Sequence, residues 1–192
     1  MKCFSKARIP TDFGNFVMMC FAEDENDRMP HVVLMKEGTE LAKAIPVRIH
    51  SECLTGDLFG SHRCDCGEQL AASLQYIAEH GGLLVYLRQE GRGIGLINKL
   101  KAYELQDKGL DTAEANLHLG FEIDEREYND ALTILKELGV HEVRLLTNNP
   151  EKIAAFENSH IEIKERVPLV MKEKSENMRY FETKRRLLGH LF

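Results

Sequence analysis

Along the chain, short continuous runs of hydrophobic residues alternate with segments in which hydrophobic residues recur every three to four positions. Residues 83–87 form a continuous apolar run, which is typical of a strand buried in the centre of a sheet. The preceding stretch, 66–80, carries Leu70, Leu74 and Ile77 on one helical face, and a glycine pair ends it. Strands are expected at 6–21 (after a turn), 31–35, 45–50, 83–87, 142–147, 161–163 and 166–170.

The helical segments alternate with these strands, which is typical of α/β construction. The pattern predicts a mixed β-sheet with helices packed on its faces, plus an N-terminal antiparallel strand region. The polar stretch 121–128 is harder to interpret. Extended alternation would put Asp124 and Arg126 on one face, whereas a solvated charged loop fits equally well. Helices are expected at 66–80, 94–109, 111–116, 128–139, from 150 onward, and at 175–188, the last with one solvated face.

Composition narrows the class of protein. The chain has 192 residues, of which 43% are hydrophobic, and this suits one domain covering 1–192. No apolar run approaches the length of a membrane span, and no leader-like segment follows Met1, so we expect a cytoplasmic protein without a membrane partner. The net charge of −6 argues against broad nucleic-acid binding but permits a local basic pocket for a phosphorylated small molecule.

Three of the five cysteines lie in one turn-rich segment, at Cys53, Cys64 and Cys66. Thiolates at this spacing are good zinc ligands, and three protein ligands leave a position for water, as in catalytic zinc sites. Buried free thiols are an alternative, although the neighbouring Arg, Asp, His and Glu side chains favour a polar site. A disulfide is less favoured, because two cysteines separated by one residue pair poorly and no secretory context is visible.

Two loops have the character of anion sites. The glycine-rich turn 88–95 follows a predicted strand and carries Arg88 and Arg92, but its G-x-G-x-G spacing is neither a dinucleotide fingerprint nor a P-loop. A tight turn that needs positive φ is the alternative. Thr147 and Lys152 flank a predicted helix N-terminus, where backbone amides attract anions, although plain capping explains the same residues.

Five long motifs, in order along the chain, resemble those of GTP cyclohydrolase II, the zinc enzyme that begins riboflavin synthesis from GTP. They cover 48–57, 61–67, 88–96, 103–112 and 144–152, within a resemblance that runs from about Pro10 to Leu188. The resemblance implies one Zn²⁺ per subunit, Mg²⁺ with the GTP triphosphate, and a homodimer.

The resemblance also implies a role for each matching position. Zinc falls on Cys53, Cys64 and Cys66, and the catalytic roles fall on Asp124, Arg126 and Tyr103. The expected GTP contacts are Arg48, Ile49, His50, Ser51, Glu52, Gln69, Glu90, Gly91, Arg92, Thr112, Thr147 and Lys152.

The family reaction releases guanine C8 as formate and removes pyrophosphate, giving 2,5-diamino-6-(5-phosphoribosylamino)pyrimidin-4(3H)-one. Tyr103 is our candidate proton donor near N7, and Glu52 would orient or deprotonate the water. The family mechanism makes Arg126 a nucleophile on the α-phosphorus, with Asp124 as its base. Because a guanidinium stays protonated in proteins, Arg126 can instead stabilise charge while water attacks.

Two other functions fit part of the pattern. His50 and Glu52 match the H-x-E half of a nucleobase deaminase signature, but the P-C-x-x-C half is missing. A non-catalytic module stabilised by zinc would need a fourth ligand, and His50 and His62 are the nearest candidates. Neither alternative accounts for two anion loops beside an open metal site.

Overall fold

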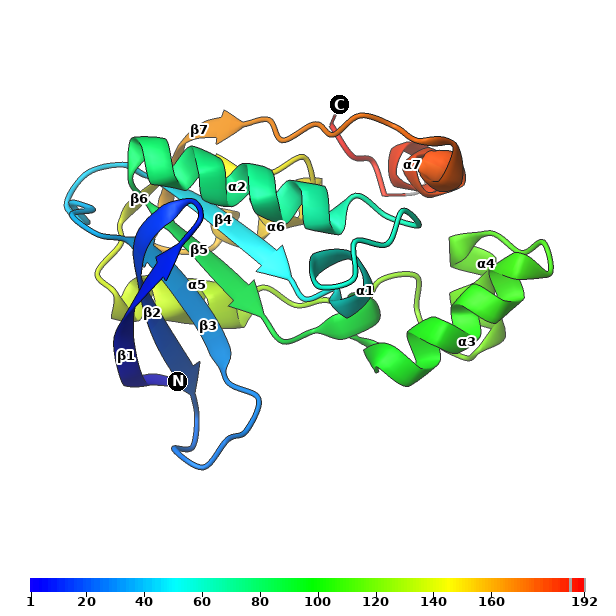
Figure 1. Ribbon diagram of the computed structural model, residues 1–192, viewed down its shortest axis with the longest axis horizontal. Helices are drawn as coiled ribbons and strands as arrows, with labels where there is room; N and C mark the ends of the chain where they lie inside the picture. The colour runs from blue at the N-terminus through cyan, green and yellow to red at the C-terminus, as the bar shows by residue number, and fades with distance from the viewer. Residues whose placement is uncertain (187, 192) are drawn as a thin grey trace.

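The computed structural model describes residues 1–186 and 188–191, and within them a single mixed sheet organises the chain (Figure 1). Its strand order is β1-β2-β3-β5-β4-β6-β7, so the apolar strand β5 is central, as its sequence predicts. The side from β1 to β5 is antiparallel, and β5, β4, β6 and β7 run parallel to one another. The strands are β1 (Lys2–Thr11), β2 (Gly14–Ala22), β3 (His31–Lys36), β4 (Ile45–Ser51), β5 (Leu83–Leu87), β6 (Glu142–Leu146) and β7 (Glu162–Val167).

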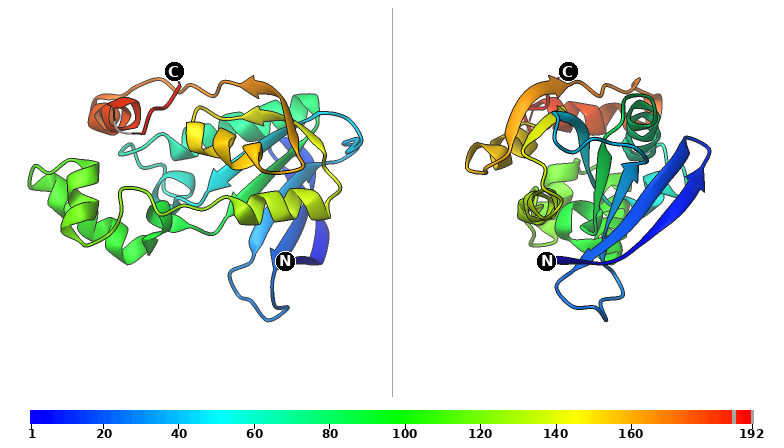
Figure 2. Two further views of the ribbon diagram at one scale, coloured as in Figure 1. Left: turned by 180° about the vertical axis from the view of Figure 1, so that it is seen from behind. Right: turned by 90° about the vertical axis from the view of Figure 1, so that its left-hand side faces the viewer.

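Helices cover both faces of this sheet, which confirms the expected α/β class. On one face Ile77 of α2 packs with Phe16 and Leu84, and on the other Ile134 of α5 and Phe156 of α6 join the larger core. Figure 2 shows α5 and α6 on the side opposite α2, while α3, α4 and α7 lie beyond the sheet. The helices are α1 (Leu54–Asp57), α2 (Cys66–His80), α3 (Gly95–Asp107), α4 (Thr112–His118), α5 (Asn129–Glu137), α6 (Pro150–Glu157) and α7 (Met178–Arg186), with 3-10 turns η1 (Glu90–Gly93) and η2 (Ser175–Asn177).

The N-terminal segment differs from the expectation of a turn leading into one strand. β1 and β2 form a hairpin, and Thr11 pairs with Gly14 at its turn. β1 is almost wholly exposed and forms the edge of the sheet. Because an exposed edge strand needs no apolar face, the hydrophobic pattern gave no signal for it.

Other departures concern the later part of the chain. Residues 161–163 and 166–170 contribute to one strand, β7, rather than two. The stretch 121–128 is an irregular loop, yet it is not simply solvated, because the Asp124 and Arg126 side chains are only 6% and 14% exposed. The expected helix 175–188 begins as η2 and continues as α7 to Arg186. Leu187, inside that expected range, lies outside the described residues.

No helix in the part of the chain that the structure describes combines the length and the apolar character needed to cross a bilayer.

Candidate functional site

The three cysteines converge where β4 gives way to α1 and α2. Cys53 precedes α1, and Cys66 is the first residue of α2. The three Sγ atoms all lie within 4.8 Å of one another, and those of Cys53 and Cys64 are 3.6 Å apart. Sulfurs around a tetrahedral zinc, with Zn–S bonds of about 2.3 Å, are separated by about 3.8 Å. The observed spacing therefore fits a zinc ion bound by three thiolates.

Gly56 in α1 makes this approach of the sulfurs possible. A Cβ on this residue would lie 3.0 Å from Cys64 Sγ and 3.2 Å from Cys53 Sγ. Gly67 has the same role in the packing of α1 on α2, because its Cβ would lie 2.3 Å from the Gly56 carbonyl oxygen. Glycine is therefore needed at both positions because a side chain would not fit between these closely packed groups. An unusual backbone conformation is not the reason.

Asp57 fixes the loop that carries Cys53. Its carboxylate accepts hydrogen bonds from the Cys53 backbone amide at 3.0 Å and from the Tyr86 hydroxyl at 2.8 Å, and it pairs with His50 Nε2 at 3.0 Å. Burial lowers the pKa of His50, which keeps the ring neutral near pH 7. Within the described residues neither His50 nor His62 joins the group of three cysteines, so no histidine closes the site as a fourth ligand.

Lys99 is the cation nearest to the sulfurs. Its Nζ lies 3.1 Å from Cys53 Sγ and 2.7 Å from Glu90 Oε1. Burial disfavours the charge, but the neighbouring Cys53 thiolate and Glu90 outweigh it and raise the pKa of Lys99. Glu90 also accepts hydrogen bonds from the backbone amides of Leu54 and Gly91. Lys99 therefore offsets the negative charge of the thiolates and ties η1 and α3 to the cysteine loop.

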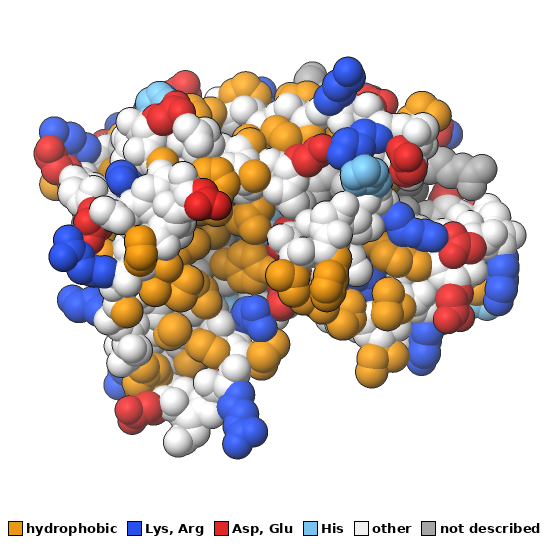
Figure 3. Space-filling view, viewed as in Figure 1, with side chains coloured by type: hydrophobic (Ala, Val, Ile, Leu, Met, Phe, Trp, Pro, Cys, Tyr) orange, Lys and Arg blue, Asp and Glu red, His pale blue; other side chains and the backbone are white. Residues whose placement is uncertain are grey.

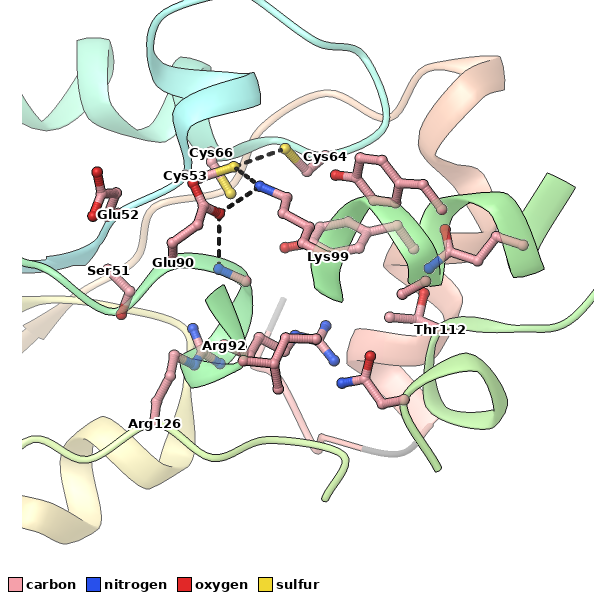
Figure 4. A pocket seen from close by; sticks show the side chains of 17 residues that line it. Ser51, Glu52, Cys53, Cys64, Cys66, Glu90, Arg92, Lys99, Thr112 and Arg126 are labelled. Atoms are coloured by element: carbon pink, nitrogen blue, oxygen red, sulfur yellow. Dashed lines mark hydrogen bonds and ion pairs between the residues drawn. The ribbon is translucent and has the colours of Figure 1, made fainter. Parts of the chain in front are cut away.

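The cysteines open into a hollow that we call the metal cavity, which has a volume of about 100 Å³ (Figure 4). Tyr103, one helical turn after Lys99, contributes to its wall. Burial raises the pKa of Tyr103, so its phenol is protonated and able to donate. The Arg63 guanidinium lies 4.8 Å from the centre of the Tyr103 ring and pairs with Asp107 at 2.5 Å. The cavity is lined by Ser51, Glu52, Cys53, Cys64, Cys66, Glu90, Gly91, Arg92, Ile94, Lys99, Ala102, Tyr103, Gln106, Thr112, Asn116, Arg126 and Tyr180.

A second hollow, which we call the cation cavity, lies beside the first and has a volume of about 50 Å³. The two share Ser51, Cys66, Arg92, Arg126 and Tyr180, so the cation cavity begins at the wall of the metal cavity. It is lined by Arg48, His50, Ser51, Cys66, Gln69, Arg92, Arg126, Thr147, Asn148, Asn149, Lys152, Tyr180, Lys184, Leu188 and His190.

Three of its cations donate to neutral oxygens. Arg48 binds the Leu146 carbonyl and the Gln69 side chain, Lys152 binds the Ile49 carbonyl, and Arg92 reaches the Ile123 carbonyl. None of these three forms a salt bridge with a carboxylate among the described residues. The Arg48 Nε atom is buried without a hydrogen-bond partner there.

The positive charges in the cation cavity lower one another's pKa values. Burial lowers the pKa of Arg48 to about 10, and burial together with Arg48 and Arg126 lowers the pKa of Lys152 well below its usual value. The pKa of His190 falls to about 3, first through burial and then through Lys184. A multiply charged anion would relieve this repulsion, and a nucleotide's phosphate groups have that charge.

Arg126 has a carboxylate partner two residues away. Its Nε donates to Asp124 Oδ1 at 2.8 Å, its Nη2 pairs with Oδ2, and its backbone amide also binds Oδ1 at 3.1 Å. Burial opposes ionisation of Asp124, but the contact with Arg126 outweighs it and lowers the pKa of the carboxyl. Arg126 is therefore held as a charged, oriented guanidinium at the wall between the cavities.

Arg92, also on the shared wall, has a left-handed backbone with φ of 62°, and so does Gly91 with φ of 64°. Among the described residues Arg92 is the one residue other than glycine with positive φ. Such a conformation costs of order 1 kcal/mol and is found where function requires it. The glycine-rich turn therefore has the positive φ of a tight turn and also places Arg92 on the shared wall, whereas anion binding there stays a prediction.

The structure brings nearly all of the expected site residues to these two hollows. Ile49 and Asp124 line neither of them: the Ile49 side chain lies in the core, and Asp124 holds Arg126. Several lining residues were missed from the sequence. Lys99 shares a helical face with Tyr103, which by itself does not indicate a site. Tyr180 and Lys184 belong to the last helix, whose charged residues suggest solvent exposure, and His190 follows that helix.

Comparison with known proteins agrees with these motifs. The sequence pattern described as GTP cyclohydrolase II matches residues 2–168. A GTP cyclohydrolase-2 from Picrophilus torridus is 49% identical over 190 residues and covers 98% of both chains. "Riboflavin biosynthesis protein RibBA" of Staphylococcus saprophyticus is 52% identical over 97% of this chain and 47% of its own, and that of Bacillus cereus is 53% identical over 95% and 46%.

The chain therefore spans about half the length of these RibBA relatives, and nearly the whole length of the Picrophilus relative. The match extends over most of the residues that build the two cavities, including all three cysteines. The chain belongs to the GTP cyclohydrolase II family.

Proposed function

We propose that this chain hydrolyses GTP at guanine C8 and releases formate and pyrophosphate, giving 2,5-diamino-6-(5-phosphoribosylamino)pyrimidin-4(3H)-one as the first step of riboflavin biosynthesis. One observation carries the proposal: the three-sulfur group and the cation cavity share a wall that includes Arg92 and Arg126. A single nucleotide can therefore place its base beside the sulfurs and its phosphates among the cations.

Cys53, Cys64 and Cys66 would hold one Zn²⁺ per subunit, since an all-sulfur set at this spacing suits zinc. Zinc supplies Lewis-acid activation of water for attack on C8. Glu52 lines the metal cavity, where its carboxylate pairs with Arg88 at 3.0 Å, and burial raises its pKa, which fits a group that takes up a proton. The protonated Tyr103 phenol donates to N7 as the imidazole ring opens, and Lys99 keeps the sulfur group electrostatically balanced.

At the phosphate end Arg48, Arg92 and Lys152 would bind the triphosphate, and Mg²⁺ bound with the nucleotide would offset part of its negative charge. Thr147 lies at the same place, after β6 and before α6. The nucleoside between the two ends is supported by the remaining expected contacts that line the cavities, which are Ser51, Gln69, Glu90, Gly91 and Thr112. Ile49 lies in the core and serves this site only through its carbonyl, which accepts a hydrogen bond from Lys152. His50, held neutral by burial, lines the cation cavity, and its buried Nδ1 has no hydrogen-bond partner among the described residues.

Arg126 acts in this proposal by stabilising charge at the α-phosphorus while water attacks. Its bidentate pairing with Asp124 keeps the guanidinium protonated, and a protonated guanidinium has no lone pair with which to attack phosphorus. Trapping a phosphoramidate on Arg126 by rapid quench and mass spectrometry would instead establish the nucleophilic role. Asp124→Asn should lower the rate of pyrophosphate release and raise the required GTP concentration, because it loosens the orientation of Arg126.

The direct test incubates the purified chain with GTP, Zn²⁺ and Mg²⁺ and measures formate, pyrophosphate and ammonia together. Formate and pyrophosphate in a one-to-one ratio, without ammonia, is the expected result. Ammonia without formate would assign a deaminase. Neither product, together with a metal spectrum showing a closed site without water, would assign a zinc-stabilised binding module.

We also propose that residues 1–192 form one domain, that the chain works in the cytoplasm, and that it is a homodimer. Leu58, Phe59 and Ile97 support the last point, because they are 69%, 72% and 73% exposed on and near α1 and α3. Figure 3 shows hydrophobic side chains gathered on this face. Exposed apolar residues of this size are typical of an interface. Light scattering after chromatography gives the mass: a dimer is expected, and a monomer would contradict the proposal.

A further inference from the structure

The C-terminal segment reaches both cavities, although residues after 168 lie outside the family match. After β7 the chain crosses the end of the sheet, forms α7 opposite α4, and returns toward β6 and α6 (Figures 1 and 2). The Leu191 backbone amide binds the Asn148 carbonyl at 2.8 Å, which fixes that return. Through this path Tyr180, Lys184, Leu188 and His190 line the cation cavity.

A buried ion pair connects α7 to the cysteine segment. Lys184 Nζ lies 2.6 Å from Asp65 Oδ1, and Asp65 stands between two of the sulfur-bearing residues. The two side chains are only 7% and 1% exposed. Burying a charged pair costs several kcal/mol in desolvation, so stability alone is a weak reason for such a contact. A positioning role explains it better.

The pair is the first link of a chain of contacts that ends on a wall cation. The second oxygen of Asp65 accepts a hydrogen bond from Gln69 Nε2 at 2.7 Å, and Gln69 Oε1 accepts one from Arg48 Nη2 at 2.6 Å. Asp65 thus joins three elements: α7, the start of α2 and the strand β4 that carries Arg48. Movement of α7 would therefore alter both the cysteine segment and the orientation of Arg48.

Tyr180 occupies the junction of the hollows. Its side chain lines the metal cavity, the cation cavity and a neighbouring hollow that extends over Tyr103 and Thr112. Lys184 Nζ lies 4.5 Å from the centre of the Tyr180 ring, and the Arg92 guanidinium lies 5.8 Å from it. An aromatic ring flanked by cations, at the passage between a base site and a phosphate site, is suited to pack against a nucleoside.

We infer that α7 is a working part of the nucleotide site: Tyr180 packs against the nucleoside where it passes between the cavities, and Lys184, through Asp65, positions the cysteine segment and Arg48. This inference rests on the proposed function and deepens it, by adding a binding residue and a positioning residue that lie beyond the family match. Tyr180 touches the substrate, whereas Lys184 acts through Asp65.

The first test compares Tyr180→Ala, Tyr180→Phe and the wild type for binding of a GTP analogue with an α,β-methylene bridge, by calorimetry. We expect Tyr180→Ala to weaken binding about tenfold to hundredfold, because stacking on a base contributes about 1–3 kcal/mol. Tyr180→Phe keeps the ring and should bind within about threefold of wild type. Zinc content should stay unchanged in both variants. Wild-type affinity in Tyr180→Ala would overturn the inference.

Glu182→Gln is the matched control, because Glu182 is exposed on the same helix and pairs outward with Arg186. It should leave analogue binding and formate release unchanged. A wild type that binds the analogue but makes no formate would overturn the proposed reaction and leave the Tyr180 comparison valid. A wild type that does not bind the analogue would overturn both.

The second test uses only the wild type and asks whether α7 forms part of the nucleotide site. Trypsin cleavage within α7 of the wild type should slow by about tenfold or more at saturating analogue if the helix forms part of the site, because bound ligand suppresses local opening. Cleavage after the exposed Arg28, in the loop between β2 and β3, serves as the internal reference. Equal rates in α7 with and without analogue would overturn the inference.

Lys184→Met and Asp65→Asn then separate positioning from structure. Each should weaken analogue binding and lower kcat, and the double variant should show non-additive losses because the two residues act as one unit. Glu182→Gln again provides the reference. Additive losses of analogue affinity in the double variant would contradict the positioning role. Single variants that are more stable than wild type and bind the analogue normally would also contradict it.

Discussion

The metal cavity and the cation cavity share a wall, but their charged groups are assembled differently. The three sulfurs of the metal cavity come from one continuous segment, 53–66, across α1 and into α2, although the rest of that cavity is lined by residues from other parts of the chain. The cation cavity collects residues from β4, α2, the glycine-rich turn, the 121–128 loop, the start of α6 and α7. A local site can be recognised from spacing, whereas a dispersed site exists only after folding.

The two cavities also have opposite charge requirements. Three cysteine sulfurs, which bind metals as thiolates, lie beside a single lysine, so the metal cavity suits a metal cation. Arg48 and Lys152, which donate to neutral oxygens, leave the cation cavity in need of an anion. In the proposed function a zinc ion and a triphosphate supply these charges, and away from the shared wall and from Asp65 each cavity should bind its ion largely independently of the other. Substitutions that affect one cavity and spare the other test this separation.

Cys64→Ser should have the largest effect. It removes one of the three proposed zinc ligands, so zinc content should fall and formate release should decrease by at least about a thousandfold, because activation of the attacking water would be lost. Pyrophosphate release should continue and GMP should accumulate, since the cation cavity is unchanged. Zinc by atomic absorption, with formate and GMP by chromatography, provides the measurement.

Cys3→Ser is the control for this variant, because Cys3 is exposed on β1 and lies outside both cavities. It should retain zinc and activity. Formate release at the normal rate in Cys64→Ser would show that the metal assignment is wrong.

How far the sequence predicted these features depends on burial and on distance along the chain. β5, α2 and α5 were recognised because buried faces impose a clear hydrophobic period, whereas β1 was missed because it buries almost nothing. The spacing of the three cysteines predicts a metal site without help from the family resemblance. The family resemblance, rather than pattern, provided most of the dispersed residues.

The missed site residues share a physical cause. Lys99 and Lys184 lie on helices with many charged positions, and a lysine on such a helix usually faces solvent. Only the packing of α3 beside α1, and of α7 beside the start of α2, brings them to Cys53 and Asp65. Lys99 and Cys53 are 46 positions apart in the sequence, and Lys184 and Asp65 are 119 positions apart. A pattern of neighbouring residues cannot predict contacts over such separations.

Lys152→Met should produce the second largest effect, confined to the cation cavity. The apolar side chain removes a charge that burial and neighbouring cations disfavour, so the free energy of unfolding without nucleotide should not fall. The KM for GTP should rise about a hundredfold through loss of a charged phosphate contact. Denaturant unfolding and steady-state kinetics measure the two quantities, and zinc content should match wild type.

An unchanged KM in Lys152→Met, or a loss of zinc, would contradict the separation of the cavities. Lys101→Met offers a comparison, because Lys101 is exposed on α3 and lines neither cavity.

Gly56→Ala should have a smaller effect, on the metal cavity alone. The added Cβ comes within 3.0 Å of Cys64 Sγ, so the sulfurs must shift by a few tenths of an ångström. We expect zinc affinity to fall about tenfold, as for other changes that displace metal ligands without removing them. Competition with a chelator measures this affinity. Binding of the α,β-methylene analogue should be unchanged, and a parallel loss of analogue affinity would mean that the cavities are coupled.

Arg92 tests the wall that the cavities share, and its effect on stability should be the smallest. Arg92→Ala removes the guanidinium but keeps a Cβ on a left-handed backbone, whereas Arg92→Gly removes both the cation and the strain. Arg92→Gly should therefore unfold with a free energy about 1 kcal/mol higher than Arg92→Ala. Both variants should bind the analogue equally weakly, because both lack the charge. Denaturant titration and calorimetry on the pair make the comparison. A difference in affinity between them would mean that the backbone conformation of the turn, and not only its cation, shapes the anion site.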